Sequence, residues 1–470
     1  MAKLKLILLQ VTVRHPPLVN FNYRKLPVHP IMTTAPAAHS LPLPPGRSGL
    51  PFIGETISFL TDPDFADKRH KQYGELFRTH LFGRPTIYLA GAEAVRFLLL
   101  HENQYFRTSW PASTQALLGP ASLSVQQGST HQQRRKLLAQ AFQPRTLASY
   151  ITTMMDITRH YLDRWQQQGT LTWYPELRNY TLDIACKLIV GISSGSQTHF
   201  GEWFEIWLQG LFSIPLKLPG TRFSRALRSR ELLLAEIERI VLERQQQEDA
   251  GQDSLGLLIQ ARDDEGNGLS VAELKDQVLN LLFAGHETLT SALTAFCLLM
   301  AQHPTVLERI RAEQETFKQR QSLTLEDLKQ MEYLEQVLKE VLRVMPPVGG
   351  GFREVIQTCE IDGYKIPQGY SVLYQIGRTH QDSTIYPEPK QFDPDRFDGN
   401  RTDKTIPFSY VPFGGGVREC LGKEFARLEM KIFAALLVRD YEWELLPDQN
   451  LDFEMIPTPR PKDGLKVKFR

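Results

Sequence analysis

Hydrophobic and polar residues follow two different periods along this chain of 470 residues. Residues 75–95 alternate between apolar and polar types, which predicts short strands of a small sheet. Residues 97–345 follow a mostly helical pattern. Residues 352–375 return to alternation, and Asp362-Gly363 predicts a tight turn between two of their strands. The expected fold is therefore mainly α, with a large helical domain and a smaller β-rich region.

The longest apolar run, from Val278 to Met300, predicts a central helix. The run is apolar nearly all round, which is typical of a helix buried on every side. Ser270 and Glu273 are spaced as a capping box in front of it. The run is long enough to span a bilayer, but His286 and its neighbours interrupt it with polar groups, which favours a core helix.

The chain divides into an N-terminal extension and one large domain. Residues 1–40 contain prolines and follow neither period, so we expect a disordered extension, with the ordered chain beginning near Met32. The apolar stretch at residues 4–13 is shorter than the ~20 residues that span a bilayer, so no transmembrane anchor is expected. No linker-like stretch divides the chain between residue 60 and the C-terminus, which predicts a single domain over residues 41–470.

Charge and cysteine usage narrow the class of protein. The formal net charge of +1 gives no indication of a nucleic-acid partner. The four cysteines are scattered without paired spacing, which indicates a reducing compartment and predicts a soluble, cytoplasmic protein. The scatter also argues against structural zinc, which needs four closely placed ligands.

One cysteine lies in a distinctive loop with the sequence Phe413-Gly-Gly-Gly-Val-Arg-Glu-Cys420-Leu-Gly422. Its glycines let the backbone bend sharply and approach a flat ligand. Cys420 precedes a predicted helix, whose free first-turn amides can stabilise a thiolate. Arg418 can pair with a ligand carboxylate. A lone cysteine is usually a small buried hydrophobe, but a single thiolate ligand in such a loop suits haem iron.

This loop resembles the haem-binding loop of the cytochrome P-450 monooxygenases, F-x-x-G-x-R-x-C-x-G. The matching residues, in order, are Phe413, Gly416, Arg418, Cys420 and Gly422. The resemblance implies a cytochrome P-450 fold, haem b as the cofactor, and Cys420 as the thiolate ligand of the iron. It also implies an external electron donor, because the sequence contains no flavin or iron–sulfur motif.

The central helix carries a second match, because Ala284-Gly285-His286-Glu287-Thr288 fits the family motif A-G-x-[D/E]-T. A glycine inside a helix costs up to ~1 kcal/mol relative to alanine; here it would leave a groove for the macrocycle and dioxygen. The resemblance implies that Thr288 and Glu287 guide protons to bound oxygen. The alternative for Thr288 is a hydrogen bond to its own helix. Leu289 stands where the family often has a second hydroxyl residue.

Three further residues match a buried network of the family. Glu340 and Arg343 lie one helical turn apart and fit its E-x-x-R motif, and Arg396 fits its later arginine. Alone, the first two would be a common surface pair worth ~0.3 kcal/mol. The resemblance implies a desolvated structural network that holds the cysteine loop in place.

Haem carries two propionates, so cationic partners are expected besides Arg418. Arg353 matches the basic position that the family has there. His131 and Arg135 occupy the family's W-x-x-x-R position, with His131 in place of tryptophan. Histidine can still donate a hydrogen bond to a carboxylate.

Apolar walls that could bind substrate look like ordinary core in a sequence. By the resemblance, the candidate walls are Trp110, Leu117, Phe212, Val348, Gly350, Phe352 and Thr458. The stretch 346–353 and the cysteine loop resemble the retinoic-acid-hydroxylating branch of the family, including a cyanobacterial retinoic acid hydroxylase. The implied substrate is an apolar isoprenoid such as retinoic acid, for which Gly350 would leave room. Fatty acids and sterols are alternatives.

The expected electron donor is a ferredoxin-type protein, and a monomer is expected. Lys423, Arg427 and Lys431 recur every four residues after the cysteine and would form a basic stripe for an acidic donor. The alternative is an ordinary solvated helix face. A non-catalytic haem sensor or carrier on the same fold is a second class of function, which the intact pair Glu287-Thr288 disfavours.

Overall fold

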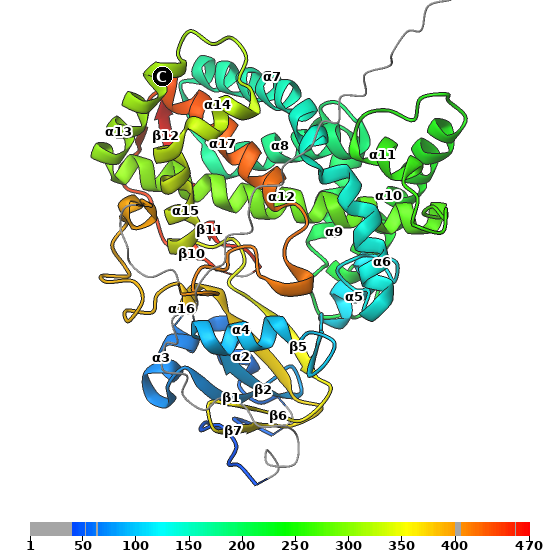
Figure 1. Ribbon diagram of the computed structural model, residues 1–470, viewed down its shortest axis with the longest axis vertical. Helices are drawn as coiled ribbons and strands as arrows, with labels where there is room; N and C mark the ends of the chain where they lie inside the picture. The colour runs from blue at the N-terminus through cyan, green and yellow to red at the C-terminus, as the bar shows by residue number, and fades with distance from the viewer. Residues whose placement is uncertain (1–39, 52, 63, 400–405, 456) are drawn as a thin grey trace, which may run out of the picture.

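The computed structural model describes residues 40–51, 53–62, 64–399, 406–455 and 457–470. The predicted extension, including Met32, lies outside the described residues except for residue 40. Figure 1 shows a large helical part and a smaller part with most of the strands, joined through the middle of the molecule. The predicted fold class, mainly α with a β-rich region, is confirmed.

Helices dominate the chain from residue 92 to residue 344, and a short and a long helix follow later. The α-helices are α2 (Thr56–Thr61), α3 (Phe65–Tyr73), α4 (Ala92–Leu100), α5 (Ala112–Leu118), α6 (Gly128–Ala139), α7 (Pro144–Gln168), α8 (Trp173–Ala185), α9 (His199–Leu208), α10 (Arg222–Gln245), α11 (Ser254–Gln260), α12 (Val271–Gln302), α13 (Pro304–Gln314), α14 (Leu325–Gln330), α15 (Glu332–Val344), α16 (Ile376–Thr379) and α17 (Lys423–Asp440).

The strands form one five-stranded sheet and three smaller ones. They are β1 (Leu76–Leu81), β2 (Arg84–Leu89), β3 (Phe106–Thr108), β4 (Thr170–Thr172), β5 (Gly350–Val355), β6 (Cys359–Ile361), β7 (Tyr364–Ile366), β8 (Ser371–Gln375), β9 (Trp443–Leu445), β10 (Phe453–Glu454), β11 (Arg460–Pro461) and β12 (Lys466–Phe469). The large sheet has the order β1-β2-β8-β5-β3, and the small ones are β4-β12-β9, β6-β7 and β10-β11.

The large sheet pairs a strand that precedes most of the helices in the sequence with a strand that follows them. Strands β2 and β8 are parallel neighbours, whereas the other pairs of this sheet are antiparallel. A parallel pair needs a long crossover, and here most of the helices lie in the chain between its two strands. The predicted turn at Asp362-Gly363 joins β6 to β7 with φ values of 50° and 77°.

The alternating pattern was expected to reach residue 95, but β2 ends at Leu89 and α4 begins at Ala92. Gly91, with φ 91°, turns the chain between them. From there Val95, Leu98 and Leu99 recur at helical spacing and are buried.

Helix α12 is the central element of the helical part (Figure 1). Its predicted capping box is present, with the Ser270 hydroxyl accepting from the Glu273 amide and the Glu273 carboxylate accepting from the Ser270 amide. Within the described residues it is the one helix long and apolar enough to cross a membrane, and 78% of its apolar window is buried inside the molecule. The prediction of a central, buried helix is confirmed.

The hydrophobic core lies on two sides of α12 and on both faces of the large sheet. One cluster joins α12 to α7, α8, α15 and α17, and a second joins its N-terminal half to α9, α10 and α11. Two smaller clusters cover the sheet. Helix α12 is thereby fixed along both halves of its length, which gives a rigid wall for any site built along it.

Gly350 serves the sheet rather than a ligand. In the β5–β8 pair it lies opposite Gln375, and a Cβ on it would collide with the carbonyl oxygen of Tyr374. The prediction that Gly350 leaves room for substrate is therefore wrong, because its open side faces the backbone of the next strand. The neighbouring Gly349 has open space where a Cβ would be.

We expect Gly350→Ala to destabilise the protein by about 1–3 kcal/mol, as overpacking typically does. The colliding atom is backbone that cannot move without disturbing the β5–β8 hydrogen bonds. Gly349→Ala is the matched control and should leave the unfolding temperature unchanged. Equal unfolding temperatures for the two variants would contradict this account.

Candidate active site

The cysteine loop is held in a tight shape by its own backbone. The Cys420 amide donates to the Phe413 carbonyl at 2.9 Å, and Gly416 adopts a φ of 64°. A Cβ on Gly416 would collide with the carbonyl of Leu99, so the loop packs against the end of α4. Gly422 then leads directly into α17.

Cys420 is the exposed one among four free cysteines, and the other three are buried. Desolvation by nearby protein atoms nevertheless raises the pKa of the Cys420 thiol. The Gly422 amide and the Arg135 charge act in the opposite direction and favour the thiolate. No cluster of three or more potential metal ligands occurs among the described residues.

Helix α12 presents an open wall at the A-G-x-E-T motif. Ala284 is exposed although most of the helix is buried, and a Cβ on Gly285 would meet open space. The Thr288 hydroxyl donates to the Ala284 carbonyl at 2.6 Å, which is the local hydrogen bond weighed above as the alternative. The wall of α12 is therefore open at Gly285, three residues before Thr288.

Glu287 is held by residues from two other elements. Its Oε1 accepts from Arg178 Nη1 at 2.5 Å, and its Oε2 accepts from the Thr458 hydroxyl at 3.5 Å. Arg178 also donates to Glu205 at 2.5 Å, which in turn lies 3.5 Å from His286 Nε2. An ionic chain thus runs from the motif acid through α8 to α9.

The acid at the far end of this series of ion pairs, Glu205, is held in its charged form. Burial opposes its ionisation, but the hydrogen bond with His286 and the charge of Arg178 lower the pKa of Glu205 to about 2. Sequence reasoning missed Arg178 and Glu205. Neither belongs to a motif, and only the packing of α8 and α9 on α12 brings them together.

The structure brings Glu340, Arg343 and Arg396 together in the core. Arg343 donates to both carboxylate oxygens of Glu340, at 2.7 and 2.8 Å, and neither side chain is exposed. Arg396 Nε lies 3.5 Å from the same carboxylate. Arg343 also donates to three carbonyls, those of His380, Pro389 and Gln391. All five N–H groups of this guanidinium are therefore hydrogen-bonded.

The four residues predicted to bind propionates gather beside the cysteine loop. Arg418 and Arg135 act on His131, and together with burial, the largest cause, they lower its pKa to about 4. Arg353 and Arg418 both bind the buried carboxylate of Glu102, through Nε atoms at 2.6 and 2.9 Å. Glu102 was not predicted, because no motif contains it.

These residues fit a bound group with carboxylates. The buried His131 Nδ1 has no hydrogen-bond partner, and Arg135 no ion pair, in the part of the chain that the structure describes. Arg353 and Arg418 each make two hydrogen bonds there, although a guanidinium has five N–H groups. Together with the open side of Gly285, this arrangement fits haem with its propionates on the arginines.

The predicted substrate residues are distributed unevenly. Phe212 and Val348 are exposed, at 44% and 38%. Trp110 is half-buried and donates to the Ser124 carbonyl at 2.8 Å. Leu117 is fully buried in the cluster around α10, so its side chain is core in this conformation. Phe352 packs on the sheet cluster that includes Phe65 and Tyr88.

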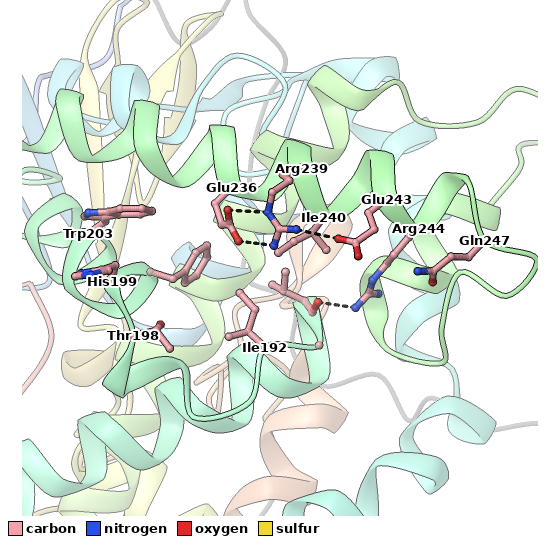
Figure 2. A pocket seen from close by; sticks show the side chains of 13 residues that line it. Ile192, Thr198, His199, Trp203, Glu236, Arg239, Ile240, Glu243, Arg244 and Gln247 are labelled. Atoms are coloured by element: carbon pink, nitrogen blue, oxygen red, sulfur yellow. Dashed lines mark hydrogen bonds and ion pairs between the residues drawn. The ribbon is translucent and has the colours of Figure 1, made fainter.

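A separate surface hollow of about 590 Å³ lies between α9 and α10 (Figure 2). Its charged side chains are already paired: Arg239 binds Glu236 and Glu243, and Arg244 binds the Val190 carbonyl. None of the predicted site residues lines it. This hollow is therefore not the site of the chemistry.

The predicted basic stripe after the cysteine is wrong as a free cationic surface. Lys431 is buried and binds Glu335 at 2.9 Å and the Leu328 carbonyl. Arg427 pairs with Glu335 as well as Glu424, and Lys423 pairs with Glu419 at 3.0 Å. The three basic residues do recur every four positions on α17, but their spacing could not show that Glu335 of α15 pairs with two of them.

The sequence model of the cytochrome P-450 family matches residues 44–469. The chain belongs to the cytochrome P-450 family. A Synechocystis relative, cytochrome P-450 120, is 53% identical over 441 residues, covering 93% of this chain and 99% of the relative. Cytochrome P-450 26A1 of Gallus gallus is 37% identical over 445 residues, covering 91% and 90%.

Among solved structures, a retinoic-acid-bound cyanobacterial CYP120A1 is 53% identical, with a TM-score of 0.88, covering 92% of this chain and 99% of that one. The cytochrome P-450 assignment makes the protein a haem-thiolate monooxygenase, as the resemblance implied. It acts on a small molecule and takes electrons from a redox partner. The alternative of a non-catalytic carrier is set aside.

In this cytochrome P-450 we expect Glu340→Gln to cost about 3–5 kcal/mol, because it leaves the buried Arg343 without its counter-charge. Haem incorporation should fall with it, since the network lies behind the loop. Glu332→Gln, at the exposed first residue of the same helix, is the matched control and should cost about 1 kcal/mol or less. Chemical denaturation and haem content per protein would check both. Equal losses would sink the idea of a special role for Glu340.

Proposed function

We propose that the protein hydroxylates retinoic acid or a closely similar apolar isoprenoid acid. The supporting observation is the likeness to the retinoic-acid-bound CYP120A1, which extends over 92% of this chain at 53% identity. Fatty acids and sterols are the competing substrates, and they differ from retinoic acid in flexibility or in lacking the carboxylate.

The haem is held by residues of four elements in this proposal. Cys420 is the thiolate ligand, Phe413 and Gly422 shape the loop around it, and Gly285 leaves space on the opposite wall. The propionates bind the cluster of His131, Arg135, Arg353 and Arg418. When bound, the haem activates O2 and supports insertion of one oxygen atom into a C–H bond, with electron density pushed from the thiolate.

Thr288 and Glu287 handle protons beside that space. The Thr288 hydroxyl can hold a proton or a water at Oγ1 once it turns from the Ala284 carbonyl, to which it donates at 2.6 Å. Glu287 lies next to it, and its pairing with Arg178 links it to Glu205, whose side chain is 38% exposed. Arg178 stays charged between the two carboxylates, so this chain orients Glu287 and does not itself pass a proton.

Substrate binding rests on apolar contact and on one polar position. Val348, Phe212 and Trp110 offer accessible apolar surface, and Thr458 contacts the motif acid. Burial of a long apolar chain gives ~25 cal/mol per Å², reduced by the cost of association. Leu117 would contribute only after a side-chain rearrangement, because it is fully buried in a hydrophobic cluster, whereas Phe352 is partly buried.

The electron donor is proposed to be a ferredoxin-type protein. Near the cysteine, Lys423 and Arg427 keep over a third of their side chains exposed even though both are paired, as does Lys339 on α15. Exposed cations at the sulfur side of the haem would steer an acidic donor, and the effect should weaken with salt.

The remaining proposals concern the state of the chain. We propose that residues 41–470 act as one domain, as a monomer, in the cytoplasm and without a membrane anchor. The continuous match over residues 44–469 supports the single domain. Helix α12 is long enough to cross a membrane, but it is mostly buried inside the molecule, which supports its being a core helix and not a membrane span.

Titration of retinoic acid into the purified protein should shift the haem absorption from the low-spin to the high-spin form. The physical reason is that a bound apolar ligand displaces water from the haem pocket. A saturated fatty acid and a sterol are the comparison ligands and should give a weaker shift. A clear shift with either of them, and none with saturating retinoic acid, would replace the proposed substrate.

Thr288→Ala should bind haem and substrate normally but lower product formation by up to about a hundredfold, the lower end of what a positioned proton donor contributes. Electrons would be diverted to peroxide or water. Thr294→Ala is the control, because Thr294 makes the same kind of bond to its own helix, to the Thr290 carbonyl, in a fully buried place. Product and peroxide per electron pair are measured. Unchanged coupling in Thr288→Ala would count against its role.

A further inference from the structure

A buried acid outside every motif joins the two arginines of the proposed propionate site. Glu102 follows the end of α4, and its side chain is 2% exposed. Its Oε2 accepts from Arg353 Nε at 2.6 Å and its Oε1 accepts from Arg418 Nε at 2.9 Å. One carboxylate thus binds the sheet to the cysteine loop.

The surrounding packing makes this contact rigid. The cysteine loop lies against the end of α4, where Leu99 leaves no room for a side chain at Gly416. Strand β3 follows Glu102 closely and pairs with β5, with Thr108 opposite Arg353. The backbone at Glu102 is therefore held by α4 before it and by β3 after it, whereas both arginines reach it with long side chains.

Glu102 leaves part of each guanidinium free. Arg353 uses Nε for Glu102 and Nη1 for the Phe352 carbonyl, and Arg418 uses Nε for Glu102 and Nη2 for the Gln126 carbonyl. Arg418 Nη1 makes no hydrogen bond within the described part of the chain, and the guanidinium of Arg353 lies over Tyr374, with its carbon 5.3 Å from the ring centroid. Terminal nitrogens such as Arg418 Nη1 are the ones a ligand carboxylate can still bind.

The side chains of the cluster carry a net positive charge. Arg135, Arg353 and Arg418 carry +3 and Glu102 carries −1, which leaves +2, since burial and the two nearby arginines keep His131 neutral at pH 7. Unbalanced buried charge is costly. Two propionates would bring the sum to zero.

We propose that Glu102 is a positioning residue for haem: it fixes Arg353 and Arg418 by their Nε groups, turns their terminal nitrogens toward the propionates, and supplies the one negative charge that makes the loaded site neutral. This inference rests on the proposed propionate site. The opposite possibility is that Glu102 occupies the arginines only when haem is absent and competes with the propionates.

Three variants separate these possibilities. Glu102→Gln keeps the size of the side chain but removes the charge and one acceptor. Glu102→Asp keeps the charge but shortens the reach to the arginines. Glu354→Gln is the matched control, because Glu354 follows Arg353 on the same strand and forms an exposed pair with Arg107 at 2.9 Å.

Two readouts on the purified holoenzyme are needed besides folding checked by circular dichroism. Transfer of haem to excess apomyoglobin should be about tenfold faster in Glu102→Gln and Glu102→Asp, in the range typical of residues that orient metal-site ligands. The midpoint potential should become more positive in Glu102→Gln, because lost negative charge favours the reduced haem. Glu102→Asp should keep the parent potential, and Glu354→Gln should change neither readout.

The inference is overturned if Glu102→Gln retains haem as long as the parent or longer, which is the result for a competitor. It is also overturned if Glu354→Gln shifts the potential as much, or if Glu102→Asp shifts it like Glu102→Gln. Should Glu102→Gln not take up haem, Glu102→Asp carries the test. Arg353→Gln and Arg418→Gln test the underlying site: if both retain haem normally, the propionate assignment itself fails.

Discussion

The geometry of the site depends on a guanidinium that is wholly inside the protein. Arg343 has no exposed surface, and its five N–H groups bind Glu340 and three carbonyls of the segment 380–391. The same segment reaches the cysteine loop, because the Val411 amide donates to His380 Nε2 at 2.8 Å. Helix α15 therefore positions the start of a loop that lies about 70–80 residues later in the chain.

Helix α12 is the second fixed body, and the site forms between it and the loop. Its burial on two sides explains how it tolerates Gly285 and an exposed Ala284 in its middle, since packing rather than helix propensity stabilises it. Glu287, the acid of its motif, is bound by other side chains of the protein. Arg178 and Thr458 approach Glu287 from α8 and from the C-terminal segment, so three distant stretches of sequence determine the position of one carboxylate.

The sequence was informative where a signal is local. The capping box at Ser270, the buried run of α12, and the turn at Asp362-Gly363 each depend on a few neighbouring residues, and all three are present. The motif residues of the site could be named through the resemblance, although the roles of most of them stay predictions. Contacts between elements could not be read in this way.

The errors have the same physical origin. Glycine at position 350 indicated free space, but only the register of β5 with β8 shows which atom fills that space. The spacing of Lys423, Arg427 and Lys431 indicated one helix face, but only the packing of α15 on α17 places Glu335 between two of them. Glu102 and Arg178 could not be found because the motif residues they bind, Arg353 and Glu287, are more than 100 residues away.

Two groups of buried arginines therefore perform different tasks in one fold, and their hydrogen bonding distinguishes them. Every donor of Arg343 has a protein acceptor, so that network is complete without a ligand and can only hold structure. Arg353 and Arg418 have two bonds each and share one carboxylate, so their network is incomplete within the described residues. Because an unsatisfied buried cation is costly, the incomplete group gains most from an anion, which is a reason to place the propionates there and not at Arg343.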